Sequence, residues 1–456
     1  EQRERAKADA KAKKSGHTDV SEYRKIAELG KKLEFVGYSE FQTESNVLGI
    51  LIDGAMASHA NEGDEVEVIL DRTPFYAEGG GQLADGGLIR AHDGSLIEID
   101  DVQAPIPGVF VHRGRVARGS WESGVAVHAE IDLERRHGIS RAHTATHMVH
   151  KAFREILGET ATQAGSENAP GRFRFDFPSA GAVSAATLSE VEGRVNTLLL
   201  EDLEVTAQQM SQADAKAIGA MALFGEKYGD VVRVVSVGDW ARELCGGTHV
   251  SRSGQLGVVK LLGESSIGAG VRRVEALVGV DAYSFLAREH VLLNSINEIV
   301  KGTRIEELPE RISQMVSKMK EIEKELAQIK TKQALSESVN LLSNAEKVGN
   351  LSVITHELSP NLSGDDLRVI ALDLRSKLSN SVVALASQGA EKVVLVIAAD
   401  DSARAAGVKA GVLVKDASAI LGGGGGGKDD FAQGGGVDSK QISVALNAIK
   451  EAIRKL

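Results

Sequence analysis

The feature of this sequence that most constrains its fold is a set of four residues in two pairs. His143 and His147 are spaced i,i+4, and so are Cys245 and His249; Cys245 is the only cysteine among 456 residues. Two imidazoles from one segment, with a thiolate and an imidazole from another, suit a tetrahedral zinc site. Positions 147 and 245 are 98 residues apart. If all four residues bind one ion, the fold must bring two distant segments together.

The local sequence around both pairs favours this interpretation. Histidines at i and i+4 lie on one helix face, and the two glycines between Cys245 and His249 let the backbone curl. Each pair alone is ambiguous, because a histidine pair can be an exposed polar pair and a lone cysteine is often a small buried hydrophobe. Four protein ligands make a closed structural site, whereas a catalytic zinc keeps an open position; both remain open. We interpret the other histidines near the pairs as non-ligands: His112, His128, His137 and His150.

The composition indicates the class of protein. A hydrophobic content of 42% with 26% charged residues is typical of a soluble globular chain, and the length predicts about three or four domains. One cysteine excludes an internal disulfide and favours a reducing compartment. No segment resembles a signal peptide or a bilayer-spanning helix, so we expect a cytoplasmic protein with no membrane partner. Because the net charge is −11, we expect no DNA binding, and RNA binding would depend on local basic patches.

Hydrophobic periodicity predicts the secondary structure around the two pairs. Alternating segments at 47–52, 64–70 and 95–99, separated by Gly and Asp turns, predict short strands of a small antiparallel barrel. A helical period over 138–157 carries the histidine pair. A β-branched run at 231–237 predicts a buried strand that leads to the cysteine.

Residues 303–345 contain a heptad pattern. Apolar residues recur in alternating steps of four and three, with Lys and Glu between them: Leu308, Ile312, Met315, Met319, Ile322, Leu326 and Ile329. The pattern fits a helical hairpin packed within one chain, and it also fits a coiled coil between two copies. A homodimer through 303–345, or through the last domain, is the second interpretation.

Together these patterns predict an α+β multidomain protein. It has a small β-barrel, a zinc-containing α/β core, a long helical or coiled-coil linker and a small C-terminal α/β domain. The first residues read as the middle of a charged helix with no N-cap, so we expect part of a longer protein. The expected boundaries are 1–30 for the charged helix, 31–137 for the barrel, 138–285 for the zinc-binding core, 286–348 for the helical segment and 349–456 for the glycine-rich C-terminal domain.

Both metal-ligand motifs resemble the editing domain of alanyl-tRNA synthetases. The motifs are His-Thr-Ala-Thr-His at 143–147 and Cys-Gly-Gly-Thr-His at 245–249. The family usually has serine where this chain has Gly79, and often Arg-Pro where it has Lys428 and Asp429. The resemblance continues in order along nearly the whole chain, through segments 72–82, 163–166, 172–177, 268–276 and 422–436.

The resemblance implies an editing hydrolase within an alanine–tRNA ligase. Its expected substrates are the esters of mischarged Ser-tRNA(Ala) and Gly-tRNA(Ala), with one Zn²⁺ held by the four residues of the two pairs. Thr146 and Gln163 match family positions in the editing pocket, where we expect them to recognise the substrate. Nothing resembles the class II aminoacylation core, so ATP and Mg²⁺ would act only upstream of Glu1. The family's C-terminal domain binds tRNA, and the candidate tRNA-binding residues of this chain are Arg172, Arg174, Arg272, Arg273 and Lys428.

Plainer interpretations stand beside these expectations. Thr146 could bond only to its own helix backbone, Gln163 could be an exposed loop amide, and each arginine could be an ordinary surface residue. The segment 422–428 nearly fits a phosphate-binding loop, but Asp429 replaces the Ser or Thr that binds magnesium, so we reject a nucleotide triphosphatase. A free-standing trans-editing deacylase and a tRNA-binding module with a structural zinc remain alternative functions.

Overall fold

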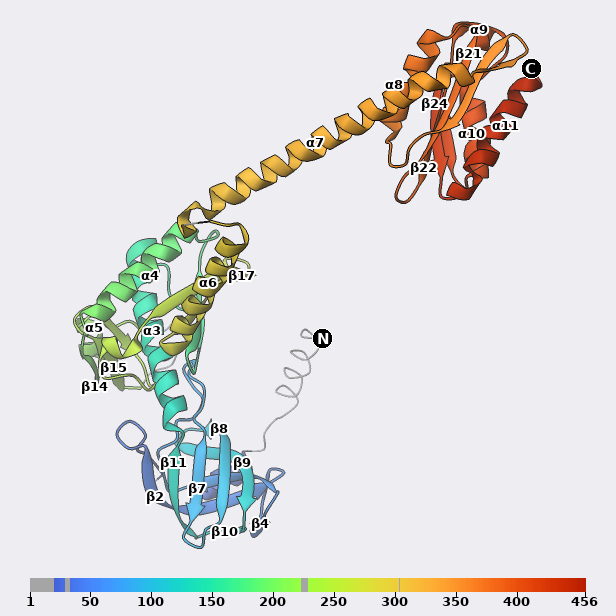
Figure 1. Ribbon diagram of the computed structural model, residues 1–456. Helices are drawn as coiled ribbons and strands as arrows, with labels where there is room; N and C mark the ends of the chain where they lie inside the picture. The colour runs from blue at the N-terminus through green and yellow to red at the C-terminus, as the bar shows by residue number, and fades with distance from the viewer. Residues whose placement is uncertain (1–19, 29–32, 223–228, 303) are drawn as a thin grey trace. The chain divides into compact units, whose positions relative to one another are not determined.

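A computed structural model describes residues 20–28, 33–222, 229–302 and 304–456, without the side chains of 330, 331, 333–335 and 337–339. It divides into two compact units, 1–293 and 294–456, which we describe separately (Figure 1). Most of the charged helix expected at 1–30 lies outside the described residues; α2 (Ser21–Ala27) is the part that is seen. Among the described residues, no helix is long and apolar enough to cross a membrane.

The first unit begins with a closed antiparallel barrel (Figure 1). Six strands pair in the order β11-β7-β8-β9-β5-β2, and pairing of β11 with β2 closes the ring. They are β2 (Gln42–Ile52), β5 (Glu65–Leu70), β7 (Gly87–Ala91), β8 (Leu96–Ile106), β9 (Val109–Arg118) and β11 (Ala126–Ile131). Shorter strands lie around them: β1 (Glu34–Phe35) with β6 (Arg72–Thr73), β3 (Ala55–Met56) beside β2, and β4 (His59–Asn61) with β10 (Ser120–Glu122).

Side chains of the barrel strands point alternately into the ring and out of it. Val47 and Val68 point into an aliphatic interior where both are almost fully buried, while their neighbours along each strand face outward. Tyr23 and Ile26 of α2 join Leu51 in a second apolar cluster on the outside of the ring. A closed ring leaves none of these six strands with an unpaired edge.

The rest of the first unit is an α/β core around one long helix. Its elements are α3 (Leu133–Leu157), β12 (Gly165–Ala169), β13 (Arg172–Pro178), α4 (Ala185–Leu200), β14 (Val205–Ser211), α5 (Gln212–Ala217), β15 (Val231–Val237), β16 (Ala241–Leu244), η1 (Ser253–Leu256), β17 (Val259–Gly268), β18 (Val271–Val278) and the first part of α6 (Val280–Ile299), which continues into the second unit. One sheet has the order β12-β13-β18-β17 and the other β14-β15-β16. The apolar face of α3 packs with α4 and the first sheet, including a stack of Phe153 and Phe177.

A buried ion pair joins the barrel to α3. Arg136, 2% exposed, donates from Nε to both carboxylate oxygens of Asp85 at 2.9 and 3.0 Å. Its Nη1 donates to the carbonyl of Gly37 (2.7 Å) and its Nη2 to that of Pro74 (2.8 Å). Since His143 follows two helical turns later, this pair fixes the histidine face of α3 against the barrel.

The second unit is a mixed six-stranded sheet covered on both faces. The sheet order is β19-β20-β21-β22-β24-β23; α8 packs on one face, and α10 and α11 pack on the other. Its strands are β19 (Glu346–Val348), β20 (Leu351–Glu357), β21 (Ser381–Gln388), β22 (Val393–Ala399), β23 (Gly424–Gly427) and β24 (Phe431–Gly436). Its helices are η2 (Ile305–Glu307), α7 (Leu308–Leu341), η3 (Leu342–Asn344), α8 (Gly364–Lys377), α9 (Asp401–Ala405), α10 (Ala410–Ile420), η4 (Ser439–Gln441) and α11 (Ile442–Arg454).

The glycine run forms two strands of this sheet and is not a linker. β23 and β24 pair as a hairpin, and Lys428 lies exposed in its turn. A Cβ on Gly425 would lie 2.5 Å from Cγ1 of Val414, and one on Gly434 would lie 2.8 Å from the same atom. The absence of side chains therefore lets α10 pack directly on the hairpin backbone.

The heptad residues lie along α7, where they are exposed. Leu308, at the start, is 5% exposed, but the side chains that follow are 41–61% exposed: Ile312, Met315, Met319, Ile322, Leu326 and Ile329. Within the described part of the second unit, no other helix covers this seam, and the hairpin interpretation stays a prediction. The coiled coil between two copies stays a prediction.

Candidate metal centre

The fold brings the two predicted pairs together. One ligand atom from each of His143, His147, Cys245 and His249 lies within 4.8 Å of all the others. Sγ of Cys245 lies 3.4 Å from Nε2 of His143 and 3.3 Å from Nε2 of His249. With usual Zn–S and Zn–N bond lengths, a tetrahedral site has an S···N edge of roughly 3.5 Å. This donor set therefore fits a zinc ion.

The surroundings of Cys245 and His249 shift the pKa of each toward the form that binds a cation. Burial raises the pKa of Cys245, but the positive potential of the three imidazoles lowers it well below its usual range. Burial also lowers the pKa of His249, to about 3. Thiolate and neutral imidazole are the forms that bind metal.

Gln82 of the barrel orients the first histidine. Its Oε1 accepts a hydrogen bond from Nδ1 of His143 at 2.9 Å and one from the backbone N–H of Thr248 at 2.8 Å. Its Nε2 donates to the Thr248 hydroxyl at 2.9 Å, which also meets Ser140 Oγ at 2.9 Å. With Nδ1 protonated, Nε2 of His143 is the free ligand atom, as in many zinc sites.

Thr144 orients the last histidine in the same way. Its hydroxyl donates to the carbonyl of Ser140 at 2.8 Å, so it accepts from Nδ1 of His249 at 3.0 Å. That contact directs Nε2 of His249 toward Cys245. The residue directly after the first histidine thus positions the fourth donor.

A buried carboxylate lies behind the remaining histidine. Oε1 of Glu243, 2% exposed, lies 2.9 Å from Nδ1 of His150, and Oε2 lies 3.7 Å from Nε2 of His147. Burial lowers the pKa of His147, but the charges of Glu243 and Cys245 outweigh it and raise this pKa to about 9. A cation bound at this imidazole must therefore displace a proton.

Side chains from two other segments hydrogen-bond to the turn that carries Cys245. Nη1 of Arg233 donates to the carbonyls of Cys245 and Gly247, at 2.9 Å each, and the Tyr38 hydroxyl donates to the carbonyl of Gly246 at 2.5 Å. The Arg233 guanidinium also stacks 4.2 Å over the Tyr38 ring. A strand of the core and a loop of the barrel together fix the thiolate.

We expect Gln82→Leu to weaken metal binding roughly 10- to 100-fold, which is typical for the loss of a hydrogen bond to a ligand imidazole. Competition with a chromophoric chelator measures the affinity. Gln208→Leu, which changes an exposed glutamine of β14, is the matched control. Equal affinity in both variants would show that Gln82 has no role in binding.

The two predicted recognition residues have different surroundings. The Thr146 hydroxyl is buried, 2.6 Å from Oδ1 of Asn168 and 3.0 Å from the carbonyl of Ala142. Gln163 is half-buried and donates from Nε2 to Ser166 Oγ at 3.0 Å, not to a member of the cluster. Their roles stay predictions.

Most of the predicted tRNA-binding arginines have carboxylate partners. Arg174 pairs with Glu167 (2.9 Å), Arg272 with Glu264 (2.5 and 2.6 Å) and Arg273 with Asp176 (2.7 and 2.7 Å). Phosphate would have to compete with these carboxylates. Arg172 and Lys428 are exposed.

Sequence reasoning missed the residues that support the cluster: Tyr38, Gln82, Thr144, Arg233, Glu243 and Thr248. Signals for some of them were present. Thr144 and Thr248 lie inside the two motifs, and Arg233 interrupts the apolar run of β15. Nothing local marks Tyr38, because its contact to Gly246 spans 208 positions.

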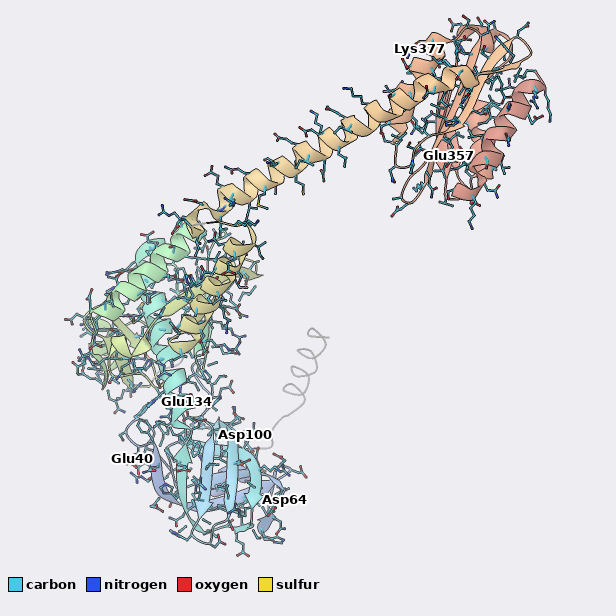
Figure 2. The ribbon with its side chains drawn as sticks, in the orientation of Figure 1. Glu40, Asp64, Asp100, Glu134, Glu357 and Lys377 are labelled. Atoms are coloured by element: carbon cyan, nitrogen blue, oxygen red, sulfur yellow. The ribbon has the colours of Figure 1, made fainter. Side chains whose placement is uncertain are left out.

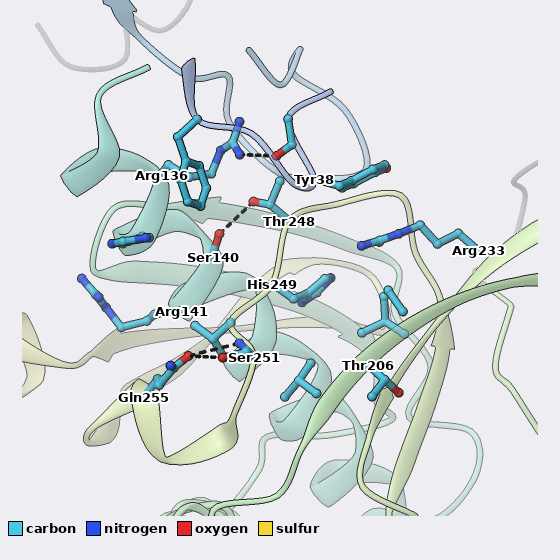
Figure 3. A pocket seen from close by; sticks show the side chains of 17 residues that line it. Tyr38, Arg136, Ser140, Arg141, Thr206, Arg233, Thr248, His249, Ser251 and Gln255 are labelled. Atoms are coloured by element: carbon cyan, nitrogen blue, oxygen red, sulfur yellow. Dashed lines mark hydrogen bonds between the residues drawn. The ribbon is translucent and has the colours of Figure 1, made fainter. Parts of the chain in front are cut away.

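A cavity of about 620 Å³ opens beside the cluster. His249 stands in its wall next to Thr248 and Ser140 (Figure 3). The barrel loop contributes Tyr38, and β15 contributes Arg233. The cavity therefore borders the side chain of one residue of the cluster.

Three sequence families match parts of the chain. The family of class II (A) tRNA synthetases matches 1–135, the threonyl and alanyl tRNA synthetase second additional domain matches 232–275, and the DHHA1 domain matches 350–455. The first match includes the barrel sequence. Our expectation that nothing here resembles the class II aminoacylation core, with its ATP and alanine sites, stays a prediction.

Curated relatives match the chain along its whole length. Alanine–tRNA ligases of Nocardioides sp. and Acidothermus cellulolyticus are both 55% identical over 100% of the chain, and that of Streptomyces avermitilis is 51% identical over 99%. The chain spans about half the length of each relative, 51%. A solved C-Ala domain of Aquifex aeolicus alanyl-tRNA synthetase is 30% identical, covering 24% of this chain and 97% of that one with a TM-score of 0.23. The chain belongs to the alanyl-tRNA synthetase family and corresponds to the C-terminal half of its members.

Proposed function

We propose that the first unit hydrolyses the ester of mischarged Ser-tRNA(Ala) and Gly-tRNA(Ala). The observation that carries this proposal is the convergence of His143, His147, Cys245 and His249 beside an open cavity. These four residues would hold one Zn²⁺. Bound there, zinc would polarise the ester carbonyl or orient the 3′ end of the tRNA.

The chain's own residues would position the reacting groups. Gln82 and Thr144 hold two imidazoles in the ligand tautomer, and Arg233 holds the turn of Cys245. His249 would bring the ligand cluster to the cavity wall, where the ester must lie. This arrangement supports substrate positioning more than a free metal hydroxide, because four protein ligands leave little room for one.

Thr146 and Gln163 stay our candidates for recognising the serine hydroxyl, and we add Asn168, which contacts Thr146. The single hydroxyl hydrogen of Thr146 is shared between two acceptors, so its oxygen can accept a further hydrogen bond. Nδ2 of Asn168 is buried and has no partner among the described residues. A serine hydroxyl placed here could accept from Asn168 and donate to Thr146. Alanine offers neither bond, and such sites reject the analogue that lacks the hydroxyl by ~10⁴–10⁵.

A second site is physically required for accuracy with alanine. A synthesis pocket that admits alanine excludes larger side chains, but it cannot strongly reject a small added hydroxyl or a missing methyl. Hydrolysis after synthesis removes such errors. The remaining expectations are also proposals: tRNA binding by the C-terminal domain, dimerisation through 303–345 or through the C-terminal domain, ATP and Mg²⁺ in another part of the ligase, and a cytoplasmic location.

The proposal is tested by incubating the chain with seryl-tRNA(Ala) and alanyl-tRNA(Ala) in parallel. We expect the seryl ester to disappear at least 100-fold faster than the alanyl ester. Acid-gel separation of charged and uncharged tRNA gives the rates. Binding of both without hydrolysis would contradict the proposal and favour a tRNA-binding module with a structural zinc. A free-standing deacylase would give the same selectivity, and failure of the native-length protein to charge tRNA with alanine would identify it.

A further inference from the structure

One buried carboxylate of the first unit has no arginine or lysine beside it. Exposed carboxylates such as Asp100 lie on the surface (Figure 2), but Asp85, Asp176 and Glu243 are buried. Arginines pair with the first two. Within the described residues, no arginine or lysine forms an ion pair with Glu243, whose contacts with basic groups are to two imidazoles. A buried anion is costly unless a cation lies close to it.

The backbone directs Glu243 toward the four metal donors. Glu243 lies on β16, two positions before Cys245, and side chains two positions apart on an extended segment point to the same side. Oε2 of Glu243 lies 3.7 Å from Nε2 of His147. The carboxylate is not one of the four mutually close donors. It can therefore act on a bound ion through its charge, without being a ligand.

His150 holds this carboxylate in place. Its Nδ1 donates to Oε1 of Glu243 at 2.9 Å, and its ring packs against Phe175 with 5.2 Å between the ring centroids. Its other nitrogen, Nε2, is buried and has no hydrogen-bond partner within the described residues. An unpaired buried nitrogen costs free energy, which a phenylalanine at this position would avoid. We therefore interpret His150 as a residue that positions Glu243.

The charge beside the cluster affects divalent and monovalent ions differently. One thiolate and three neutral imidazoles together carry a single negative charge. A divalent ion held by them keeps an excess positive charge, whereas a monovalent ion keeps none. The positive charge of Arg233 also acts on His147. Because Coulomb energy is proportional to the charge of the ion, Glu243 stabilises a divalent ion more than a monovalent one.

We infer that Glu243 makes the four-donor cluster selective for a divalent metal ion, and that His150 positions Glu243 for this role. The monovalent ion to be excluded is Cu⁺, because thiolate and imidazole are ligands that it also prefers. A buried carboxylate without an arginine or lysine then has its cation in the bound metal, which also keeps that carboxylate ionised. This inference rests on the proposed function, since it concerns the ion that the four residues would hold there.

The test compares the affinities of the full chain for Zn²⁺ and Cu⁺. Each affinity is measured without oxygen and at one pH, by competition with a chromophoric chelator for that ion. Both titrations start from the same metal-free protein, so the ratio of the two affinities reports the effect of the ion's charge. Glu243→Gln keeps an acceptor for His150 but removes the charge, and should lower the Zn²⁺/Cu⁺ affinity ratio about ten-fold or more. Glu243→Asp keeps the charge and should hold the ratio within about three-fold of the original.

Glu44→Gln is the matched control. Oε1 of Glu44 lies 2.9 Å from Nδ1 of His128, which repeats the contact of Glu243 with His150 on an exposed part of the barrel. This variant should leave the affinity ratio unchanged. The same ratio in Glu243→Gln and the original chain would overturn the inference. An equal fall in the glutamine and aspartate variants would also overturn it, because shape and not charge would then decide.

The metal titrations decide the inference separately from the proposed function. Thermal unfolding of the metal-free variants shows whether they fold. If Glu243→Gln does not fold, the double substitution Glu243→Met with His150→Phe replaces it, because exchanging a buried polar pair for apolar residues of similar size is often neutral. The expected fall in the ratio, in a chain without deacylase activity, would keep the inference and reject the hydrolase. Deacylation by a chain whose ratio does not depend on Glu243 would do the reverse.

Discussion

Cys245→Ala should abolish metal binding and reduce the deacylation of seryl-tRNA by at least 100-fold. The thiolate lies within 3.4 Å of two ligand nitrogens and is the only anionic donor of the four. Its removal leaves three imidazoles and no anionic donor for the cation. Inductively coupled plasma mass spectrometry gives the metal content per chain, and the tRNA assay gives the rate.

Ser236→Ala is the control for this experiment. It removes a small polar atom from β15, the strand next to β16, and changes no donor. We expect it to keep both metal and activity, and the two variants should have similar unfolding midpoints. Full deacylation by Cys245→Ala with no bound zinc would refute a role for the metal. Full activity with zinc retained on three histidines would instead refute the need for the thiolate.

Gly247→Ala should have the second-largest effect. A Cβ at this position would lie inside van der Waals contact with the His143 ring and 2.8 Å from Oε1 of Gln82. The turn must move away, which separates Cys245 and His249 from the histidine pair. We expect metal affinity and deacylation to fall about 100-fold and stability to fall by about 1–3 kcal/mol, as for an overpacked core. Chelator competition and thermal unfolding measure the two effects.

The neighbouring glycine provides a matched control. Gly246 is exposed, and the nearest atom to a Cβ there is the Tyr38 hydroxyl at 4.0 Å. Neither glycine has a positive φ, so the two substitutions differ in space and not in backbone strain. Gly246→Ala should therefore keep metal and activity. Equal losses in both variants would show that the turn needs flexibility at either glycine, contrary to our steric explanation.

Local patterns predicted the elements that carry the candidate site. The strands at 47–52, 64–70 and 95–99 lie within β2, β5 and β8 or overlap them closely, and the helix and the β-branched run correspond to α3 and β15. These predictions succeeded because burial of one face imposes a period on the sequence. The glycine run gave no such period, since β23 is built from glycine alone and β24 ends in three glycines.

Local periodicity did not predict contacts between residues that are distant in the sequence. The carboxylates beside Arg272 and Arg273 lie on adjacent strands and pair only after the sheet has formed. The exposed seam of α7 has the same heptad sequence whether or not a partner covers it. The sequence shows the two arginines and the heptad residues, but the partners that contact them depend on how the chain packs.

The sequence by itself determined the donor set, because i,i+4 spacing and a Gly-Gly turn bring each pair of donors to one point whatever surrounds them. Only the tertiary structure decided that the two pairs of donors meet, and which other side chains hold them by hydrogen bonds. Gln82 and Tyr38 come from the barrel, and Thr144 and Arg233 come from the core. The buried pair of Arg136 with Asp85 holds those two parts together. Spacing along the chain sets local geometry, whereas a contact such as that of Gln82 with His143, 61 positions apart, exists only once both parts have folded and packed.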